Sequence, residues 1–130
     1  MCRKIHHVKF RIRYSETDQM GYVHHANYAR YFEMGRIDWL RDLGLSYAAL
    51  ESSGVMLPVL SLSVSFFKVI HFDDEVTLET RLIKESKLYL EFAYKLYNQA
   101  QLCCAEGHTK LVFLDANTRK PMRCPKDLFK

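Results

Sequence analysis

One long amphipathic segment constrains the fold of this sequence more than any other feature. From residue 28 to residue 43, apolar side chains recur at steps of three and four, with charged residues between them. The apolar positions are Tyr28, Tyr31, Phe32, Gly35, Trp39 and Leu43. This spacing predicts an amphipathic helix of about four turns that ends at Gly44. Gly35 on its apolar face predicts close packing, because a glycine inside a helix otherwise costs about 1 kcal/mol. A second, short helix is expected at about Ser46 to Ser53.

Most of the remaining chain alternates between apolar and polar residues, which is the pattern of half-buried strands. The expected strands are Val8–Tyr14, Leu60–Phe66, Val76–Leu82, Leu88–Tyr97 and Thr109–Asp115. Short connections favour an antiparallel meander, and the one long apolar helix must cover a face of the sheet. We therefore expect an α+β chain with one antiparallel sheet packed on one central helix. A length of 130 residues suits a single domain.

Charge and cysteine patterns argue against several classes of function. The net charge is +4, from 19 Lys and Arg against 15 Asp and Glu. The basic residues are scattered along the chain, so no nucleic-acid-binding face is indicated. The four cysteines form no CxxC pair, and the histidines lack ligand spacing, so we expect no metal and no cofactor. Residues 1–7 show no secretory h-region, and no apolar stretch approaches the ~18 residues of a membrane span. We expect a cytoplasmic protein with reduced thiols.

The loop before the long helix concentrates the side chains that could carry chemistry. Residues 13–28 read Arg-Tyr-Ser-Glu-Thr-Asp-Gln-Met-Gly-Tyr-Val-His-His-Ala-Asn-Tyr. A carboxylate at Asp18 or Glu16 would lie near the free N–H groups of the helix and the positive end of its dipole. Such N–H groups are also natural donors to a developing oxyanion. One loop could therefore supply both a base or nucleophile and an electrophilic stabiliser.

This run resembles the signature D-x-x-G-x-V-x-x-x-x-Y of thioesterases in the hydroxybenzoyl-CoA thioesterase-like family. With His-Ala-Asn-Tyr at residues 25–28 it is most similar to the YbgC-type acyl-CoA thioesterases, and residues 66–76 resemble the family's second-strand exit and turn. The resemblance implies a hotdog fold over the single domain 1–130, in which a five-stranded antiparallel sheet wraps around one long central helix. It also implies a homodimer, or a dimer of dimers, in which both subunits complete each site.

The same resemblance implies roles for individual residues. Asp18 matches the family's catalytic carboxylate, and the backbone N–H of His25 matches the group that polarises the thioester carbonyl. A thiol has a pKa near 8.5 and leaves as thiolate without a strong acid, while an aspartate is already ionised at neutral pH. Asp18 could therefore attack the carbonyl or activate a water. The expected substrate-binding residues are Gly21, Val23, Asn27, Tyr28, Lys84 and Lys87. The two lysines fall in a predicted hairpin turn, where related thioesterases hold CoA phosphates.

Other roles for these residues are open. Glu16 fits a solvated or supporting carboxylate better than a catalyst. The ring of His25 could do acid–base work, although we expect its backbone to be the functional part. Adjacent histidines do not direct both side chains at one ion, which argues against metal binding. Asn27 is well placed to cap the helix as its N-cap residue, and it could also contact the substrate or fix the loop.

Three alternatives to this reading are also open. Cys103 or Cys104 could be a nucleophile with His108 as its base, although buried and inert thiols fit better. An enoyl-thioester hydratase on the same fold is disfavoured, because the spacing from Asp18 to His24 is one residue longer than in Asp-x-x-x-x-His. A non-catalytic acyl-thioester binding protein would keep the pocket but lack the carboxylate. The sequence leaves open the acyl group and the choice between CoA and an acyl carrier protein.

Overall fold

The computed structural model describes residues 4–126, 128 and 129. Two helices lie in this part of the chain, α1 (Asn27–Asp42) and α2 (Tyr47–Ser52), together with a short 3₁₀ turn, η1 (Tyr14–Glu16). The strands are β1 (Ile5–Arg11), β2 (Val55–Met56), β3 (Val59–Phe66), β4 (Glu75–Glu85), β5 (Tyr89–Tyr97), β6 (Cys103–Val112) and β7 (Leu114–Asp115). The expected α+β class and the one long helix are therefore present. No helix among these described residues is long and apolar enough to cross a membrane.

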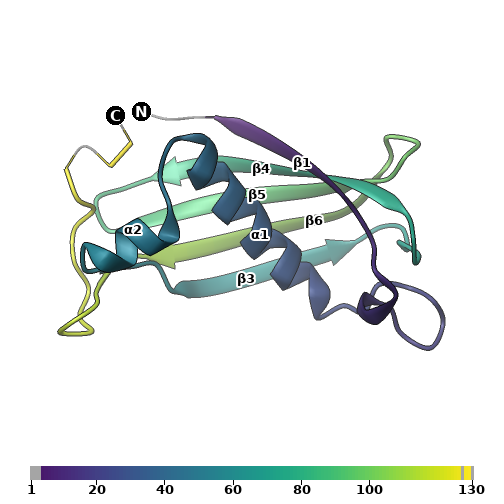
Figure 1. Cartoon of the computed structure of the whole chain (residues 1–130), viewed down its shortest axis with the longest axis horizontal. Coiled ribbons are helices and arrows are strands. Elements are labelled where there is room, and N and C mark those ends of the chain that lie inside the picture. The colour runs from purple at the N-terminus through teal and green to yellow at the C-terminus, as the bar shows by residue number, and fades with distance from the viewer. Residues whose placement is uncertain (1–3, 127, 130) are drawn as a thin grey trace.

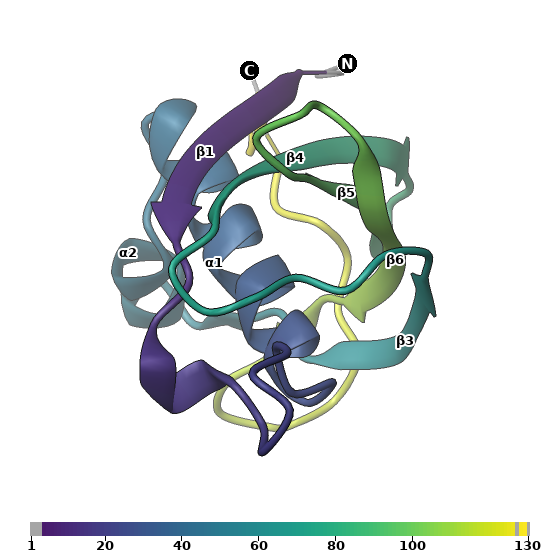
Figure 2. The same ribbon diagram turned by 90° about the vertical axis from the view of Figure 1, so that its right-hand side faces the viewer.

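Five strands form one antiparallel sheet in the order β1-β4-β5-β6-β3. The sheet curves, and α1 lies along its concave side, as the two perpendicular views show (Figures 1 and 2). The short strands β2 and β7 form a separate two-stranded ribbon that the sequence analysis missed. Two-residue strands are too short to produce a visible alternation of apolar and polar residues.

The expected meander is correct only for β4, β5 and β6. Strand β3 pairs with β6 and not with β4, so β3 and β1 form the two edges of the sheet. Residues 67–74 carry the chain from β3 past the ends of β6 and β5 to β4 (Figure 2). This linker can extend over about 26 Å, and three strand spacings measure only about 14 Å. The connection is long enough to skip two strands, which the meander prediction had excluded.

Several strand boundaries also differ from the prediction, and two of them change the reading of the chain. β1 ends at Arg11. The N–H of Ile12 still donates to Asp74 O at 2.9 Å, but Ile12 O accepts from Asp73, which has φ +70°, so the regular pairing with β4 breaks there. Tyr14 then begins η1 instead of ending a strand. β6 begins at Cys103, ahead of the expected start at Thr109. Its first half consists of cysteine, alanine, glutamate and glycine, which have weak strand preference and show no clear alternation.

Glycines seat α1 on the sheet. A Cβ added at Gly35 would overlap Thr80 Oγ1 and lie 2.8 Å from Leu78 Cδ2, which confirms the expected close packing at Gly35. In β6, a Cβ at Gly107 would overlap the ring of Phe32. The packing fixes the height of α1 over the sheet. The loop of residues 13–28, which we call the signature loop, runs directly into the first turn of α1. Its end is therefore fixed relative to the sheet as well.

Candidate active site

A tight turn presents Asp18 at the end of the sheet where β4 begins. The N–H of Asp18 donates to Tyr22 O at 2.7 Å, and the N–H of Gly21 donates to Asp18 O at 3.0 Å. Gly21 has φ +79°, a conformation that side chains with a Cβ rarely adopt, so the turn needs a glycine there. Val23 then donates to Ile70 O at 2.8 Å, which docks the loop onto the linker between β3 and β4.

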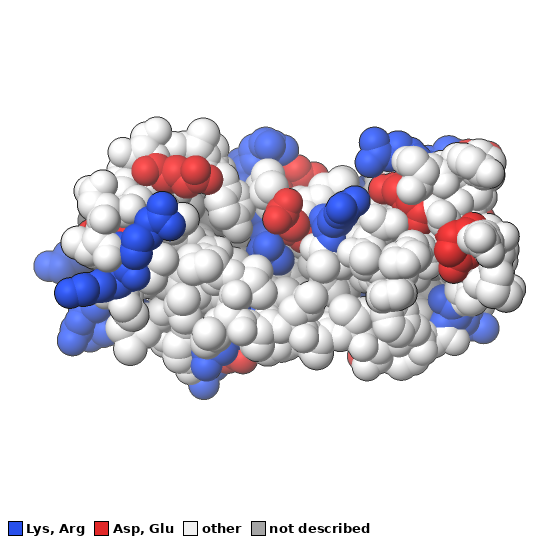
Figure 3. All heavy atoms as spheres, turned by 90° about the horizontal axis from the view of Figure 1, so that it is seen from below, with Lys and Arg blue, Asp and Glu red and all other residues white. Residues whose placement is uncertain are grey.

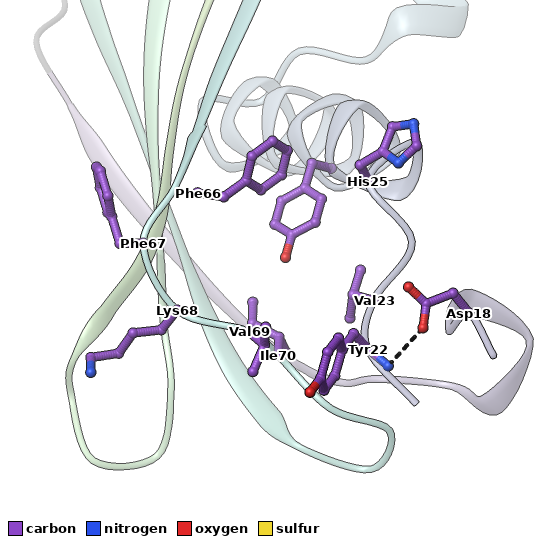
Figure 4. Close-up of a pocket in the computed structure, with 10 residues that line it drawn as sticks. Asp18, Tyr22, Val23, His25, Phe66, Phe67, Lys68, Val69 and Ile70 are labelled. Atoms are coloured by element: carbon purple, nitrogen blue, oxygen red, sulfur yellow. Dashed lines mark hydrogen bonds between the residues drawn. The ribbon is translucent and has the colours of Figure 1, made fainter. Parts of the chain in front are cut away.

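The two oxygens of the Asp18 carboxylate have different surroundings. One oxygen, Oδ1, accepts hydrogen bonds from the backbone N–H groups of Met20 at 2.9 Å and Tyr22 at 3.2 Å. The other has no hydrogen-bond partner among the described residues and points toward the neighbouring cavity (Figure 4). The backbone donors therefore fix the orientation of the carboxylate and leave one oxygen available to a ligand.

The start of α1 leaves one backbone donor unused. The ring Nδ1 of His24 accepts from the N–H of Ala26 at 3.1 Å, and the N–H of Asn27 donates to His24 O at 2.9 Å. The N–H of His25 has no partner among the described residues, while the His25 ring stacks on His24 at 4.3 Å. The free N–H lies at the positive end of the helix dipole, where an oxyanion is stabilised.

The prediction that Asn27 caps α1 is wrong. The N-cap is Ala26, and Asn27 is the first residue of the helix. The Asn27 side chain turns back toward η1 and donates to Glu16 O at 2.8 Å. The ring of His24 accepts from one N–H at this end of the helix, that of the N-cap residue Ala26.

An open cavity of about 320 Å³ lies beside Asp18. Its lining residues are Asp18, Tyr22, Val23, His25, Tyr28, Phe66, Phe67, Lys68, Val69 and Ile70. One wall is the signature loop and the first turn of α1, and the other is the end of β3 with the linker after it (Figure 4). The Tyr28 ring meets Phe66 edge-on at 4.8 Å, and burial raises the pKa of Tyr28 to about 12, so its hydroxyl stays protonated. Aromatic and aliphatic side chains therefore share the wall of the cavity with the polar groups of Asp18, His25 and Lys68.

The structure brings together only part of the predicted site. Asp18, Val23, His25 and Tyr28 line one cavity, and Gly21 shapes the turn beside it. The second wall, residues 66–70, was missed as part of the site. Its signals in the sequence are a mostly apolar run that breaks the alternation of the preceding strand and the family resemblance of residues 66–76.

Asn27, Lys84 and Lys87 do not line the Asp18 cavity in the same chain. Asn27 lines a different cavity, on the other side of the loop. Lys84 lies near the far end of β4, about 30 Å from Glu75 at the usual rise per residue, with its ammonium 5.4 Å from the centre of the Tyr89 ring. Lys87 follows in the turn after β4.

Glu16 occupies the supporting position that the sequence analysis favoured for it. Its Oε1 accepts from the backbone N–H of Arg13 at 2.7 Å, and its Oε2 lies 3.4 Å from the Arg13 guanidinium. Its backbone oxygen also accepts from His24 and from the Asn27 side chain. Glu16 therefore organises the loop and does not line the Asp18 cavity.

The cysteine alternative has no support in the geometry. Burial raises the pKa of Cys103 and of Cys104, which disfavours the thiolate. The ring of His108 pairs with Glu91 at 3.2 Å and not with a thiol. Among the described residues, no group of three His, Cys, Asp or Glu is arranged to hold a metal ion.

Comparison with known proteins places this geometry in a wider group. A sequence profile of the thioesterase-like superfamily matches residues 12–130. The chain is 32% identical over 115 residues to "Putative acyl-CoA thioesterase YneP" of Bacillus subtilis, covering 88% of this chain and 83% of that protein. It is 27% identical over 118 residues to "Acyl-CoA thioester hydrolase YbgC" of Escherichia coli, covering 91% and 88%. A solved DHNA-CoA thioesterase from Staphylococcus aureus superposes with TM-score 0.89 at 35% identity, covering 92% and 80%.

Proposed function

The chain belongs to the thioesterase-like superfamily, and on that premise we propose that it hydrolyses an acyl-CoA thioester to a free acid and CoA. The family that the signature loop predicted is confirmed by the relatives YneP and YbgC. One observation carries the proposal for this chain. The free oxygen of Asp18 and the residue that carries the unpaired N–H, His25, line the same cavity at the start of α1.

In the proposed reaction, the thioester carbonyl oxygen accepts a hydrogen bond from the N–H of His25. The helix dipole adds to this polarisation, because both act where negative charge develops in the transition state. Asp18 then acts in one of two ways. It attacks the carbonyl carbon and forms a mixed anhydride that water hydrolyses, or it takes a proton from a water that attacks instead. In both routes CoA leaves as its thiolate.

The walls of the cavity suit the two ends of such a substrate. Tyr28, Phe66 and Val69 supply apolar surface for an acyl group. Lys68 is the one lysine or arginine among the lining residues of this cavity. We place the acyl group between α1 and the end of β3, with the thioester carbonyl at the helix N-terminus.

We also propose that the site is completed by a second copy of the chain, as one hotdog domain pairs with another. β3 is an edge strand, and its side chains Val59, Leu60, Leu62 and Phe66 are between 46% and 64% exposed. Viewed from the side where β3 lies, the middle of the molecule is mostly uncharged (Figure 3). A free edge with apolar side chains is a template for strand pairing. In an antiparallel pair of β3 strands related by a two-fold axis, the start of the partner's β3 would lie beside Phe66, the end of β3 in the first chain. This position is next to the Asp18 cavity.

Such pairing would also reposition the lysines. The far end of β4 in the partner would lie at the same end of the joined sheet as the Asp18 cavity. Four strand spacings separate it from β3 of the first chain, about 19 Å. Lys84 and Lys87 could then contact the phosphate end of an extended CoA. A size-exclusion experiment with light scattering tests the pairing: a monomer of 15.3 kDa at micromolar concentration would contradict it, and a dimer or a dimer of dimers is expected.

The activity is tested by a panel of acyl-CoA substrates with Asp18→Asn and Glu16→Gln. Asp18→Asn keeps the side-chain size but removes the base or nucleophile, so kcat should fall at least about a hundredfold. KM should change little, because the carbonyl donor is a backbone group. Glu16→Gln is the control carboxylate and should cost far less. If Asp18→Asn keeps near-full kcat while Glu16→Gln loses it, then Glu16 is the catalytic carboxylate and Asp18 the supporting one. If the wild-type protein hydrolyses no acyl-CoA, the alternative of a non-catalytic acyl-thioester binding protein replaces this one.

A further inference from the structure

A second cavity lies on the opposite side of the signature loop from Asp18. Its volume is about 650 Å³, against about 320 Å³ for the Asp18 cavity. Its lining residues are Phe10, Arg11, Arg13, Ser15, Glu16, Asn27, Arg30, Tyr31 and Met34. The end of β1, the turn η1 and the start of α1 thus enclose a space in the size range of small-molecule sites, about 300–1,000 Å³. The proposed hydrolysis does not use this space.

The charged residues around this second cavity are unbalanced. Three arginines and one glutamate line it. The guanidinium of Arg30 has no carboxylate partner among the described residues, and its one contact is Asn27 Oδ1 at 3.5 Å. Arg13 pairs with Glu16 at 3.4 Å but is 78% exposed. Arg11 donates to the backbone oxygen of Asp73 at 2.8 Å, and its guanidinium lies 3.8 Å from the carboxylates of Asp73 and Glu75. Exposed ion pairs of this kind are weak, so Arg30 and Arg13 are the arginines most available to a ligand.

The inner wall of the second cavity contains an unused hydrogen-bond donor. Tyr31 is 3% exposed, and its buried hydroxyl makes no hydrogen bond of good geometry among the described residues. Burial, then the charge of the Glu16 carboxylate and a side-chain contact with it, raise the pKa of Tyr31, so the hydroxyl stays protonated. A buried polar group without a partner costs stability, and packing alone gives no reason for a tyrosine in place of a phenylalanine.

We propose that the second cavity binds a phosphate group, either as free inorganic phosphate or as part of a nucleotide. Arg11 and Arg13 have carboxylates within 4 Å, and Arg30 is the one guanidinium of the three without a carboxylate partner among the described residues. A phosphomonoester carries roughly 1.5 to 2 negative charges and would supply the missing anion to Arg30. The planar fork of arginine pairs with phosphate oxygens through two parallel hydrogen bonds. Phe10 and Met34 add apolar wall for an organic group attached to the phosphate.

Calorimetric titration tests this site without reference to hydrolysis. Inorganic phosphate and adenosine 3′,5′-bisphosphate are titrated separately into the protein in a phosphate-free buffer of low salt. Arg30→Gln should weaken binding at least about tenfold, because it removes a charge-assisted hydrogen bond. Arg41→Gln is the matched control: it makes the same exchange on α1, at an exposed arginine that pairs with Asp38, and should change the affinity less than about twofold.

Two further variants separate this site from the Asp18 cavity and from a folding defect. Asp18→Asn should keep full phosphate affinity, whatever its effect on hydrolysis. Tyr31→Phe removes only the unpaired hydroxyl, leaves the fold intact, and should weaken binding several-fold.

Three results would overturn the proposal. Neither probe binds, or Arg30→Gln and Arg41→Gln weaken binding equally. The third is that Lys68→Gln abolishes binding while Arg30→Gln leaves the affinity unchanged. The last result would place the phosphate in the Asp18 cavity. If adenosine 3′,5′-bisphosphate binds more than about tenfold tighter than inorganic phosphate, the natural ligand is a nucleotide, and similar affinities identify free phosphate.

Discussion

Gly35→Ala should destabilise this protein, although alanine is the better helix former. Helix propensity alone favours the exchange by about 1 kcal/mol in a helix interior. The added Cβ, however, would overlap Thr80 Oγ1 and lie 2.8 Å from Leu78 Cδ2. Non-bonded carbon atoms normally stand about 3.5–4.0 Å apart. The substitution therefore sets a backbone preference against a steric conflict.

The steric conflict should win because neither neighbour can retreat. Leu78 and Thr80 are completely buried in β4, and the branched side chain of Thr80 has few rotamers. Overpacking a well-filled core costs about 1–3 kcal/mol, and two simultaneous overlaps place this case near the upper limit. Subtracting the gain in helix propensity leaves a net loss of about 2 kcal/mol. That loss corresponds to a Tm lower by roughly 5–10 °C for a chain of this size.

Urea or thermal unfolding at one fixed protein concentration measures this loss, because association would make the stability depend on concentration. Activity gives a second readout. If α1 rises from the sheet by about 1 Å, the N–H of His25 moves with it, and such a misplacement can cost about a hundredfold in rate. Gly35→Ala should therefore lower kcat more than it raises KM.

The second substitution Thr80→Ala tests the cause. It removes the overlapping oxygen, which has no hydrogen-bond partner among the described residues. Combined with Gly35→Ala it should restore part of the lost stability, giving a coupling energy between the two sites of about 1 kcal/mol. A Gly35→Ala protein that is as stable as the wild type, or no coupling in the double variant, would refute the packing argument.

Two further predictions follow from the site. Replacing Lys84 and Lys87 together by glutamine should raise KM for an acyl-CoA several-fold and leave kcat unchanged, because phosphate contacts bind substrate and transition state equally. An unchanged KM would show that neither lysine contacts the substrate. The folded-state pKa of Tyr28 is raised to about 12, above its ordinary value near 10, so its stabilising contribution is complete below about pH 10 and is lost as pH rises toward 12. In alkaline unfolding measurements, Tyr28→Phe should therefore lose less stability than the wild type over this range, and identical profiles would contradict the assignment.

The helices, the five longer strands and part of the candidate site could be predicted from the sequence because they depend on neighbours along the chain. The three- and four-residue spacing specifies α1, since helical contacts are local. Asp18, Gly21, Val23 and Tyr28 lie within one loop and one helical turn, so closeness in sequence ensured closeness in space. The family, too, was recognisable from this short run.

Strand order, by contrast, was decided only in the tertiary structure. An alternating pattern marks a strand and its buried face but carries no information about which strand lies next to it. The pairing of β3 with β6, and hence the free edge of β3, depends on contacts between residues far apart in the chain. The same pairing brought Phe66 and Ile70 to Asp18 as the second wall of the cavity. The pairing of β1 with β4 likewise left Lys84 at the opposite end of the sheet.

The direction of individual side chains in the loop was likewise a tertiary outcome. Glu16 and Asp18 are two residues apart and both carry a carboxylate, yet they line different cavities. The turn at Gly21 and the docking of Val23 onto Ile70 turn Asp18 toward β3, while Arg13 and Asn27 hold Glu16 on the other side. Each direction is set by hydrogen bonds, several of them to residues on other elements, and no local pattern encodes those.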